Sequence, residues 1–307
     1  MRASEGRALG LLAGVALDGV FGDPRRGHPV ALFGRAAGAA ERRVYGDSRA
    51  RGVLYAAALV GGVAAGGVAV ERVARGDVAR VGVTALATWA VLGGTSLGRE
   101  GLAMARFLEA GDVENARRRL SHLCARDPAR MDADGLARAT VESVAENTSD
   151  AAVAPLMWGA VAGVPGLLAY RAVNTLDAMV GYRSARYERF GWAAARLDDV
   201  ANWVPARLTG LLTVACAPRT DAWRVLRRDG GEHPSPNAGR CEAAFAGALG
   251  VRLGGTNSYG GRVERRPEMG DGRAPEVADV RRAVRLSRAV TVCAAVVCAG
   301  AAWWRRA

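Results

Sequence analysis

The twenty uncharged residues from Ala151 to Tyr170 constrain this fold more than any other feature. As a helix the run is about 30 Å long, the thickness of the hydrocarbon core of a bilayer. Clusters of acids, amides and arginines precede it in ESVAENTSD, follow it in YRAVNTLDAMVGYR, and recur in ARLDDVANWVPARL. Because ionisable groups near a bilayer are costly unless paired or ligated, we expect a functional site here.

Other segments also have the character of membrane-embedded helices. Val53 to Val70 is long enough to span a bilayer, whereas Val81 to Leu97 and Ala289 to Trp304 are slightly short. A fifth candidate, Val204 to Ala217, carries Arg207 near its start and is interpreted as snorkelling or re-entrant. The apolar N-terminal stretch is interrupted by Asp18 and is interpreted as a retained membrane-associated segment.

The sequence therefore predicts an all-α, polytopic membrane bundle with about four to six embedded segments. We expect one integral membrane domain over residues 1–307, multi-pass in the cell membrane, with a loop-rich polar insertion at about 218–288. RFLEAGDVENARRRLSHL, residues 106–123, has apolar positions at helical spacing and is predicted to be helical. Two alternatives stay open for Ala151 to Tyr170, a full crossing or a re-entrant path bent at its two prolines.

Composition narrows the classes of function. The chain has no lysine, so its net charge of +12 is carried by arginine and a Walker A phosphate loop is excluded. The apolar runs favour an anionic membrane surface or phosphorylated substrates over nucleic acid, for which no recognisable module is present. The five cysteines include no C-x-x-C pair, and the three histidines are too scattered for a metal site by spacing.

The first polar cluster places Glu142, Glu146 and Asp150 four residues apart, with Asn147 beside them. On one helix these acids share a face and repel each other, which favours a bound cation such as Mg²⁺. The alternative is a solvated acidic face paired to Arg138.

The second cluster places Arg171, Asn174 and Asp177 three residues apart, with Gly181 as a helix stop before Arg183. An arginine, an amide and a carboxylate on one face can hold a phosphate, a carboxylate and a metal. An interhelical network that only stabilises the bundle is an equal alternative.

The third cluster has adjacent acids, Asp198 and Asp199, with Asn202 one turn later and Arg207 after Pro205. This pattern suits a divalent cation with its phosphate ligand, and the alternative is helix capping. A later loop contains Asn237 ahead of a glycine-rich stretch, which is weak evidence for phosphate binding.

In this order the motifs resemble the CobD or CbiB family of cobalamin-biosynthesis membrane proteins, the adenosylcobinamide-phosphate synthases. The resemblance spans nearly the whole chain, and VAENTSD followed by YRAVNTLDAMVGYR is its most specific part. It is carried by LDGVFGDP, HPV, VESVAENTSDAAVAPLMW, YRAVNTLDAMVGYR, ARLDDVANWVPARL, SPNAGRCEAAFAGALGVRLGG and NSYGG.

The resemblance implies an ATP-dependent acid–amine ligase in the lipid bilayer. Its substrates would be adenosylcobyric acid and aminopropanol or aminopropanol phosphate, joined as an amide. Other membrane enzymes of late cobalamin assembly are candidate partners, and no nucleic acid is expected. Such a reaction calls for Mg²⁺ on the triphosphate, arginines on the phosphoryl oxygens and a base for the ammonium proton.

Within that resemblance, the acids and amides receive hypothetical roles. Asp177, Asp198 and Asp199 would bind Mg²⁺, and Arg171 and Arg183 would hold phosphate. The first cluster would supply the catalytic residues. Glu146 or Asp150 would be the base or a second metal ligand, and Glu142 is a further catalytic candidate. Binding or orienting substrate and ligands would fall to Asn147, Asn174, Asn202, Arg207 and Asn237.

Two rival functions explain the sequence less well than the ligase does. A non-catalytic membrane regulator, resembling the β-lactamase-induction membrane protein, would not need all three clusters. A transporter would be expected to interrupt its apolar runs with acids, whereas here the acids flank them.

Overall fold

The computed structural model describes residues 2–24, 27–129, 131–182, 184–259 and 262–304, with the side chains of 257–259 and 262–264 left aside. The described chain is mostly helical, as predicted, with one antiparallel hairpin. Its elements are α1 (Ala3–Phe21), α2 (Pro29–Val44), α3 (Arg49–Val73), α4 (Asp77–Val91), α5 (Gly94–Glu109), α6 (Val113–Leu120), α7 (Ala133–Thr148), the π-helical turn η1 (Ser149–Val153), α8 (Ala154–Val180), α9 (Trp192–Ala201), α10 (Trp203–Cys216), α11 (Ala222–Asp229), α12 (Ala238–Leu249), β1 (Leu253–Tyr259), β2 (Arg262–Met269) and α13 (Val277–Trp304).

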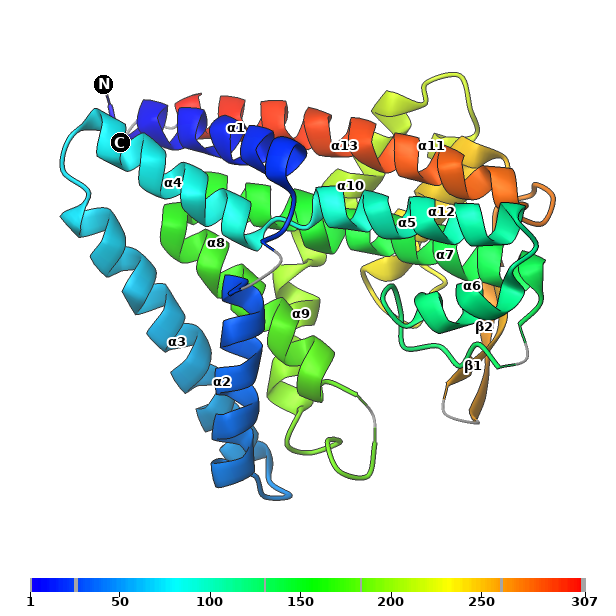
Figure 1. Ribbon diagram of the computed structural model, residues 1–307, viewed down its shortest axis with the longest axis horizontal. Helices are drawn as coiled ribbons and strands as arrows, with labels where there is room; N and C mark the ends of the chain where they lie inside the picture. The colour runs from blue at the N-terminus through cyan, green and yellow to red at the C-terminus, as the bar shows by residue number, and fades with distance from the viewer. Residues whose placement is uncertain (1, 25–26, 130, 183, 260–261, 305–307) are drawn as a thin grey trace. The chain divides into compact units, whose positions relative to one another are not determined.

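The chain divides into two compact units, which are described separately. The first comprises residues 1–93, 154–202 and 294–307. Within it α1 packs along α4, and α3 along α8 (Figure 1). A Cβ added at Gly10 or Gly14 of α1 would come within 2.5 Å of Thr84 or 2.4 Å of Thr88 of α4. These glycines therefore let the two helices approach closely, as small residues do in membrane bundles.

The second unit comprises residues 94–153 and 203–293. Its core is built from α5, α6, α7, α12, the hairpin and the start of α13, around fully buried residues such as Met104, Leu136 and Phe245. The hairpin has a register shift between Leu253 and Gly255, where β1 begins. Residues 218–288, expected to be loop-rich, thus contain two helices and a hairpin before α13.

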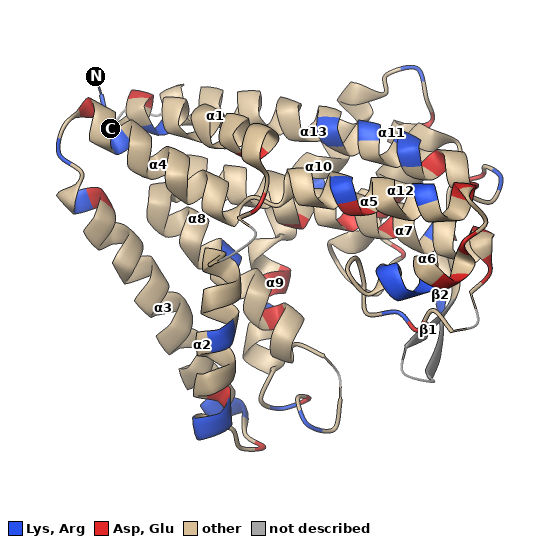
Figure 2. Cartoon of the chain, viewed as in Figure 1, with Lys and Arg blue, Asp and Glu red and all other residues tan. Residues whose placement is uncertain are grey.

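Four stretches are helical, long and apolar enough to cross a membrane: Arg49–Val73, Asp77–Glu109, Ala133–Val180 and Val277–Trp304. Each contains one of the four main segments predicted from the sequence. Figure 2 shows acidic and basic residues at the ends of α3 and an uncharged length between them. The fifth candidate corresponds to α10, a shorter apolar helix.

The Ala151–Tyr170 run is not one straight helix. It begins in η1, and α8 is broken at Gly163, which has φ 66° and ψ −148°. The break exposes backbone groups that other helices bind. Glu71 of α3 accepts a 2.8 Å hydrogen bond from the Val164 N–H, and Arg7 of α1 donates to the Ala160 carbonyl at 3.4 Å. Side chains of α1 and α3 therefore satisfy the backbone groups that the break in α8 frees.

Two of the predicted segments contain a helix end. The helix predicted over 106–123 is interrupted at Gly111, which has φ 70°, and Asp112 then caps α6 by accepting from the Asn115 N–H at 3.1 Å. The segment predicted from Val81 to Leu97 ends its helix at Val91, and α5 starts at Gly94. In both places, local capping overrides the continuous apolar pattern.

Candidate functional site

In the first unit, α8 and α9 bring together residues of the second and third sequence clusters around Asp198. Asn174 of α8 donates its amide to Asp198 Oδ1 at 3.3 Å, and Asn202 donates to Asp198 Oδ2 at 3.0 Å. The Tyr170 hydroxyl in turn donates to Asn202 Oδ1 at 2.8 Å. Because both oxygens accept from amides, the Asp198 carboxylate is fixed in place.

Arg171 continues this network towards an apolar hollow. Its Nη1 lies 3.5 Å from Asn174 Oδ1, and its buried Nε has no hydrogen-bond partner among the described residues. The hollow beside it has a volume of about 220 Å³ and is lined mainly by apolar groups, including Phe33 and Leu168. A guanidinium with unused donors is suited to a carboxylate or phosphate.

Asp177 lies one turn further along α8, against Gly181. A Cβ at Gly181 would lie 1.9 Å from Asp177 Oδ1, so a side chain there would displace the carboxylate. Partial burial and then the charge of Asp177 raise the pKa of Tyr182. Gly181 thus serves two purposes, since α8 ends at Val180 as predicted and the carboxylate needs the space.

Asp199 faces a second hollow, of about 250 Å³, in the same unit. Two arginines, Arg49 and Arg196, line it together with the aromatic residues Tyr182, Tyr187 and Trp192. Arg196 lies 3.4 Å from the Asp199 carboxylate, and the Arg49 guanidinium lies over the Trp192 ring, 5.4 Å from its centre. Arginines beside a carboxylate and aromatic faces can bind a phosphorylated, ring-containing ligand.

The second unit contains a separate buried cluster around Glu142 of α7. Arg126 forms an ion pair with Glu142, and both side chains are buried. The other carboxylate oxygen of Glu142 accepts from the Gly254 N–H at 2.7 Å. The two carboxylate oxygens of Glu142 therefore contact the Arg126 guanidinium and the first residues of β1. Glu142 thus stabilises the fold as well as being a candidate reacting group.

Glu242 of α12 is the least compensated acid in this cluster. It is fully buried, and neither carboxylate oxygen accepts a hydrogen bond from the part of the chain that is described. Burial, followed by the charges of Glu142 and Glu146, raises its pKa well above the ordinary value, against the opposing effect of Arg126 and Arg266. The fold therefore disfavours the charged form of Glu242.

His233 lies beside this acid, with its Nε2 4.0 Å from Glu242 Oε1. Burial and the charge of Arg266 lower the pKa of His233 to about 4. Its Nδ1 accepts from the Ser235 N–H at 3.0 Å, so the neutral ring carries its proton on Nε2. Burial therefore favours the uncharged form of both side chains.

The two other acids of the first sequence cluster lie close to Cys241 of α12. Burial and then the charges of Asp150 and Glu146 raise the pKa of this thiol. Asn147 donates to the Ser143 carbonyl at 2.8 Å, within its own helix. Glu142 and Glu146 lie on α7, whereas Asp150 lies in the wider η1 turn that follows it.

These observations can be set beside known proteins. The family model described as "CobD/Cbib protein" matches residues 11–287. The chain belongs to the CobD/CbiB family. "Cobalamin biosynthesis protein CobD" of Mycobacterium tuberculosis is 57% identical over 305 residues, covering 98% of this chain and 97% of the relative. Proteins of the same name from Geobacter metallireducens and Rhodobacter capsulatus are 46% and 41% identical, over 85% and 91% of this chain and 86% and 92% of their own lengths. No solved structure matches the chain.

The predicted site residues of this CobD/CbiB member fall into both units. The structure gathers Arg171, Asn174, Asp198 and Asn202 in the first unit, with Asp177 and Asp199 on the same two helices. Glu142, Glu146, Asn147 and Asp150 belong to the second unit. So do Arg207, whose guanidinium lies on the Trp203 ring, and Asn237, which precedes α12. Arg183 lies outside the described residues.

Other residues had no predicted role although the structure places them in these clusters. They are Arg49, Tyr182 and Trp192 in the first unit, and Arg126, His233, Glu242 and Arg266 in the second. The sequence offered a signal for both aromatic residues, since Tyr182 belongs to the second motif and Trp192 lies three residues before the third. Arg49 and Arg126 reach their sites by tertiary contacts alone.

The oxygen donors in the first unit fit a Mg²⁺ ion that shares its ligands with a phosphate. Within the described ranges, three or more His, Cys, Asp or Glu side chains nowhere gather as a metal cage. Mg²⁺ is normally held by one or two carboxylates, with phosphate oxygens and waters completing its shell. The fixed Asp198 and the neighbouring Asp199 supply that kind of donor set.

Proposed function

We propose that this chain is the adenosylcobinamide-phosphate synthase of cobalamin biosynthesis, a multi-pass enzyme of the cell membrane. It would join adenosylcobyric acid to aminopropanol or aminopropanol phosphate as an amide, using ATP. The observation that carries the proposal is the Asp198 carboxylate, which two amides hold beside Arg171 in a chain with relatives named for cobalamin biosynthesis.

The chemistry explains why such an arrangement is useful. A carboxylate oxygen is a poor leaving group, so an amine cannot displace it directly. ATP with Mg²⁺ supplies a phosphoryl group that turns this oxygen into a good leaving group. Asp198 and Asp199 would hold the metal, with Asp177 as a further oxygen donor, and each is anchored on a helix rather than a loop.

Arginines of the first unit supply the charges that such a reaction needs. Arg49 and Arg196 line the hollow beside Asp199 and would bind phosphate oxygens, while Tyr182 and Trp192 offer faces for an adenine ring. Arg171, which lines the apolar hollow, would orient the carboxylate that is to be activated. Positioning these charges in advance lowers the barrier without reorganisation during the reaction.

The amine must also lose a proton before it attacks the activated carboxyl group. Glu146 or Asp150 would be the base that accepts this proton.

The direct test is to incubate the purified full-length chain in detergent with adenosylcobyric acid, ATP and Mg²⁺. Aminopropanol and aminopropanol phosphate are supplied in separate reactions, and the amide is detected by mass spectrometry. We expect an amide that requires ATP and Mg²⁺. Absence of product from a folded sample with both amines would reject the ligase and favour a non-catalytic regulator.

A matched pair of variants assigns the activity to the proposed site. Asp199→Asn should abolish product formation and leave membrane insertion and thermal stability unchanged. Asp47→Asn is the control, because Asp47 forms an exposed ion pair with Arg189 in the same unit. Full activity of Asp199→Asn would remove this residue from the mechanism.

A further inference from the structure

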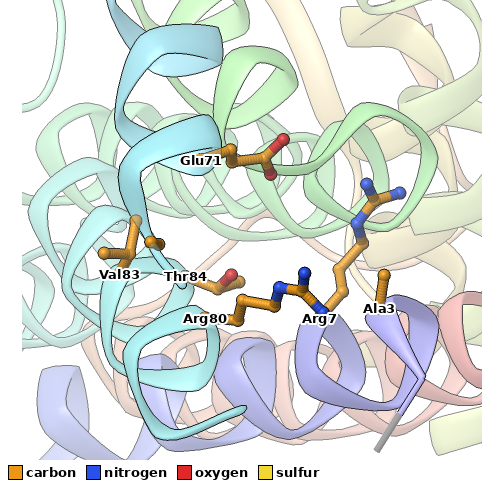
Figure 3. A pocket seen from close by; sticks show the side chains of 7 residues that line it. Ala3, Arg7, Glu71, Arg80, Val83 and Thr84 are labelled. Atoms are coloured by element: carbon orange, nitrogen blue, oxygen red, sulfur yellow. The ribbon is translucent and has the colours of Figure 1, made fainter. Parts of the chain in front are cut away.

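A small polar hollow lies in the first unit, apart from the residues assigned to the reaction. It has a volume of about 160 Å³ and is formed where α1 starts, α3 ends and α4 starts. Figure 3 shows the side chains of Arg7, Glu71, Arg80 and Thr84 around it. None of the sequence motifs includes these residues.

The charges lining this hollow do not cancel. Glu71 directs one oxygen to the Val164 N–H at the break of α8, and Arg7 donates to the Ala160 carbonyl. Neither Arg7 nor Arg80 makes an ion pair with any carboxylate in the described ranges. Two guanidinium groups and one carboxylate therefore leave a net positive charge, with N–H donors available to an anion.

The surroundings indicate which anions reach this hollow. It lies at the link between α3 and the stretch that begins with α4, both of them candidate membrane spans. Val73 and Val78, on either side of that link, are 77% and 87% exposed. Apolar side chains exposed between two membrane-length helices favour contact with lipid, which would place the neighbouring guanidinium groups at headgroup depth.

We propose that this hollow binds the phosphate group of an anionic membrane phospholipid. Arg80 and Arg7 would hold the phosphate oxygens, and the Thr84 hydroxyl is a further donor at the wall of the hollow. Guanidinium groups suit this ligand because they offer paired N–H donors in a planar fork. The lipid would also connect α1 to the start of α4, next to the capped break in α8.

The proposal is tested on the full-length chain, purified in detergent and stripped of lipid. Thermal unfolding is followed while phosphatidylglycerol or phosphatidylcholine is added, and native mass spectrometry counts retained lipids. We expect phosphatidylglycerol to stabilise the chain and to bind more tightly than phosphatidylcholine. Arg80→Gln should weaken phosphatidylglycerol binding by about tenfold or more, since it removes a charge-assisted contact.

Arg75→Gln is the matched control, because Arg75 is exposed in the same link but does not line the hollow. It should bind phosphatidylglycerol as the wild type does. Arg80→Lys, which keeps the charge and loses the fork, should bind with intermediate affinity. Equal binding by the wild type, Arg80→Gln and Arg75→Gln would overturn the proposal.

Soluble phosphates distinguish a lipid headgroup from free phosphate as the ligand of the hollow. Inorganic phosphate and glycerol phosphate should stabilise the wild type much less than phosphatidylglycerol does, because they lack acyl chains that contact the exposed valines. Equal stabilisation by inorganic phosphate, lost in Arg80→Gln, would overturn the lipid as the ligand. Ligase activity does not enter either readout, so this proposal and the proposed reaction fail independently.

Discussion

Asn202 donates its side-chain amide to Asp198 at 3.0 Å while its own carbonyl oxygen accepts from the Tyr170 hydroxyl at 2.8 Å. The Asn202 amide therefore has a single orientation. Through it, Tyr170 of α8 helps to fix the Asp198 carboxylate of α9. Replacing Asn202 with Asp would remove the donor and place a second negative charge beside Asp198.

Asn202→Asp is expected to lower amide synthesis by about 10- to 100-fold, the usual cost of losing a residue that orients a metal ligand. A higher Mg²⁺ concentration should recover part of the activity, which distinguishes a positioning role from misfolding. Asn115→Asp is the control, because Asn115 makes a similar amide contact with Asp112 on α6. Unchanged activity and Mg²⁺ dependence in Asn202→Asp would contradict this role.

Gly181→Ala should lower activity more than stability. The added Cβ would lie 1.9 Å from Asp177 Oδ1, so the carboxylate must move away from its present position. Gly19→Ala serves as the comparison, since a Cβ there meets nothing within 4 Å. Amide synthesis at several Mg²⁺ concentrations is the measurement. If both variants are equally active, Asp177 has no part in the site.

Gly163→Ala is expected to destabilise the chain by about 1–3 kcal/mol, because a non-glycine residue at positive φ is strained. The new Cβ would also lie 2.2 Å from Glu71 Oε1, which caps the broken helix. Gly61→Ala in α3 meets nothing within 4 Å and should be neutral or slightly stabilising. Thermal unfolding in detergent compares the two. Equal melting temperatures would show that the break in α8 is not required.

Glu242→Gln should remove a loss of stability that begins as the pH rises above 4.5. The folded chain keeps a proton on Glu242 above the ordinary pKa of 4.5, whereas the unfolded chain releases it. Folding then binds a proton, so the contribution of Glu242 is complete below pH 4.5 and declines as the pH rises towards the folded pKa. Melting temperature against pH should be flatter in Glu242→Gln than in the wild type or in the exposed control Glu232→Gln.

His233→Gln should change the dependence of melting temperature on pH at acid pH. The pKa of His233 falls from 6.5 to about 4 on folding, so between these values the unfolded state binds more protons. Its contribution is complete above pH 6.5 and is lost as the pH falls towards 4, with a slope of at most about 1.4 kcal/mol per pH unit. His122→Gln is the control, since that side chain is half exposed. An unchanged acid slope in His233→Gln would contradict a buried neutral imidazole.

Much of the helical framework was predictable because hydropathy and length are local properties of a segment. The four main apolar segments each lie within a helical stretch of membrane length, and α8 ends before Gly181 as expected. The unpredicted helix ends at Gly111 and Val91 arose where a glycine or a cap ended a helix inside an apolar pattern. Helix ends depend on a few hydrogen bonds, which periodicity does not detect.

The candidate site was predictable in its residue types and only partly in its grouping. The spacing correctly predicted that Arg171, Asn174 and Asp177 share one helix, α8. Asp198 and Asp199 are adjacent in sequence and both lie on α9. Spacing could not show that Glu242 and His233 would join Glu142, because the contacts cross about 100 residues of chain.

The sequence by itself determined the family, the mostly helical fold and the four membrane-length apolar stretches, since these follow from motif order and from runs of apolar residues. Only the tertiary structure decided that Asn174 and Asn202 fix one carboxylate, that Glu71 and Arg7 cap a break in α8, and that Glu242 is left without a hydrogen bond among the described residues. These are pairings between distant segments, and their energies depend on burial and on distances of a few ångströms, which no local pattern encodes.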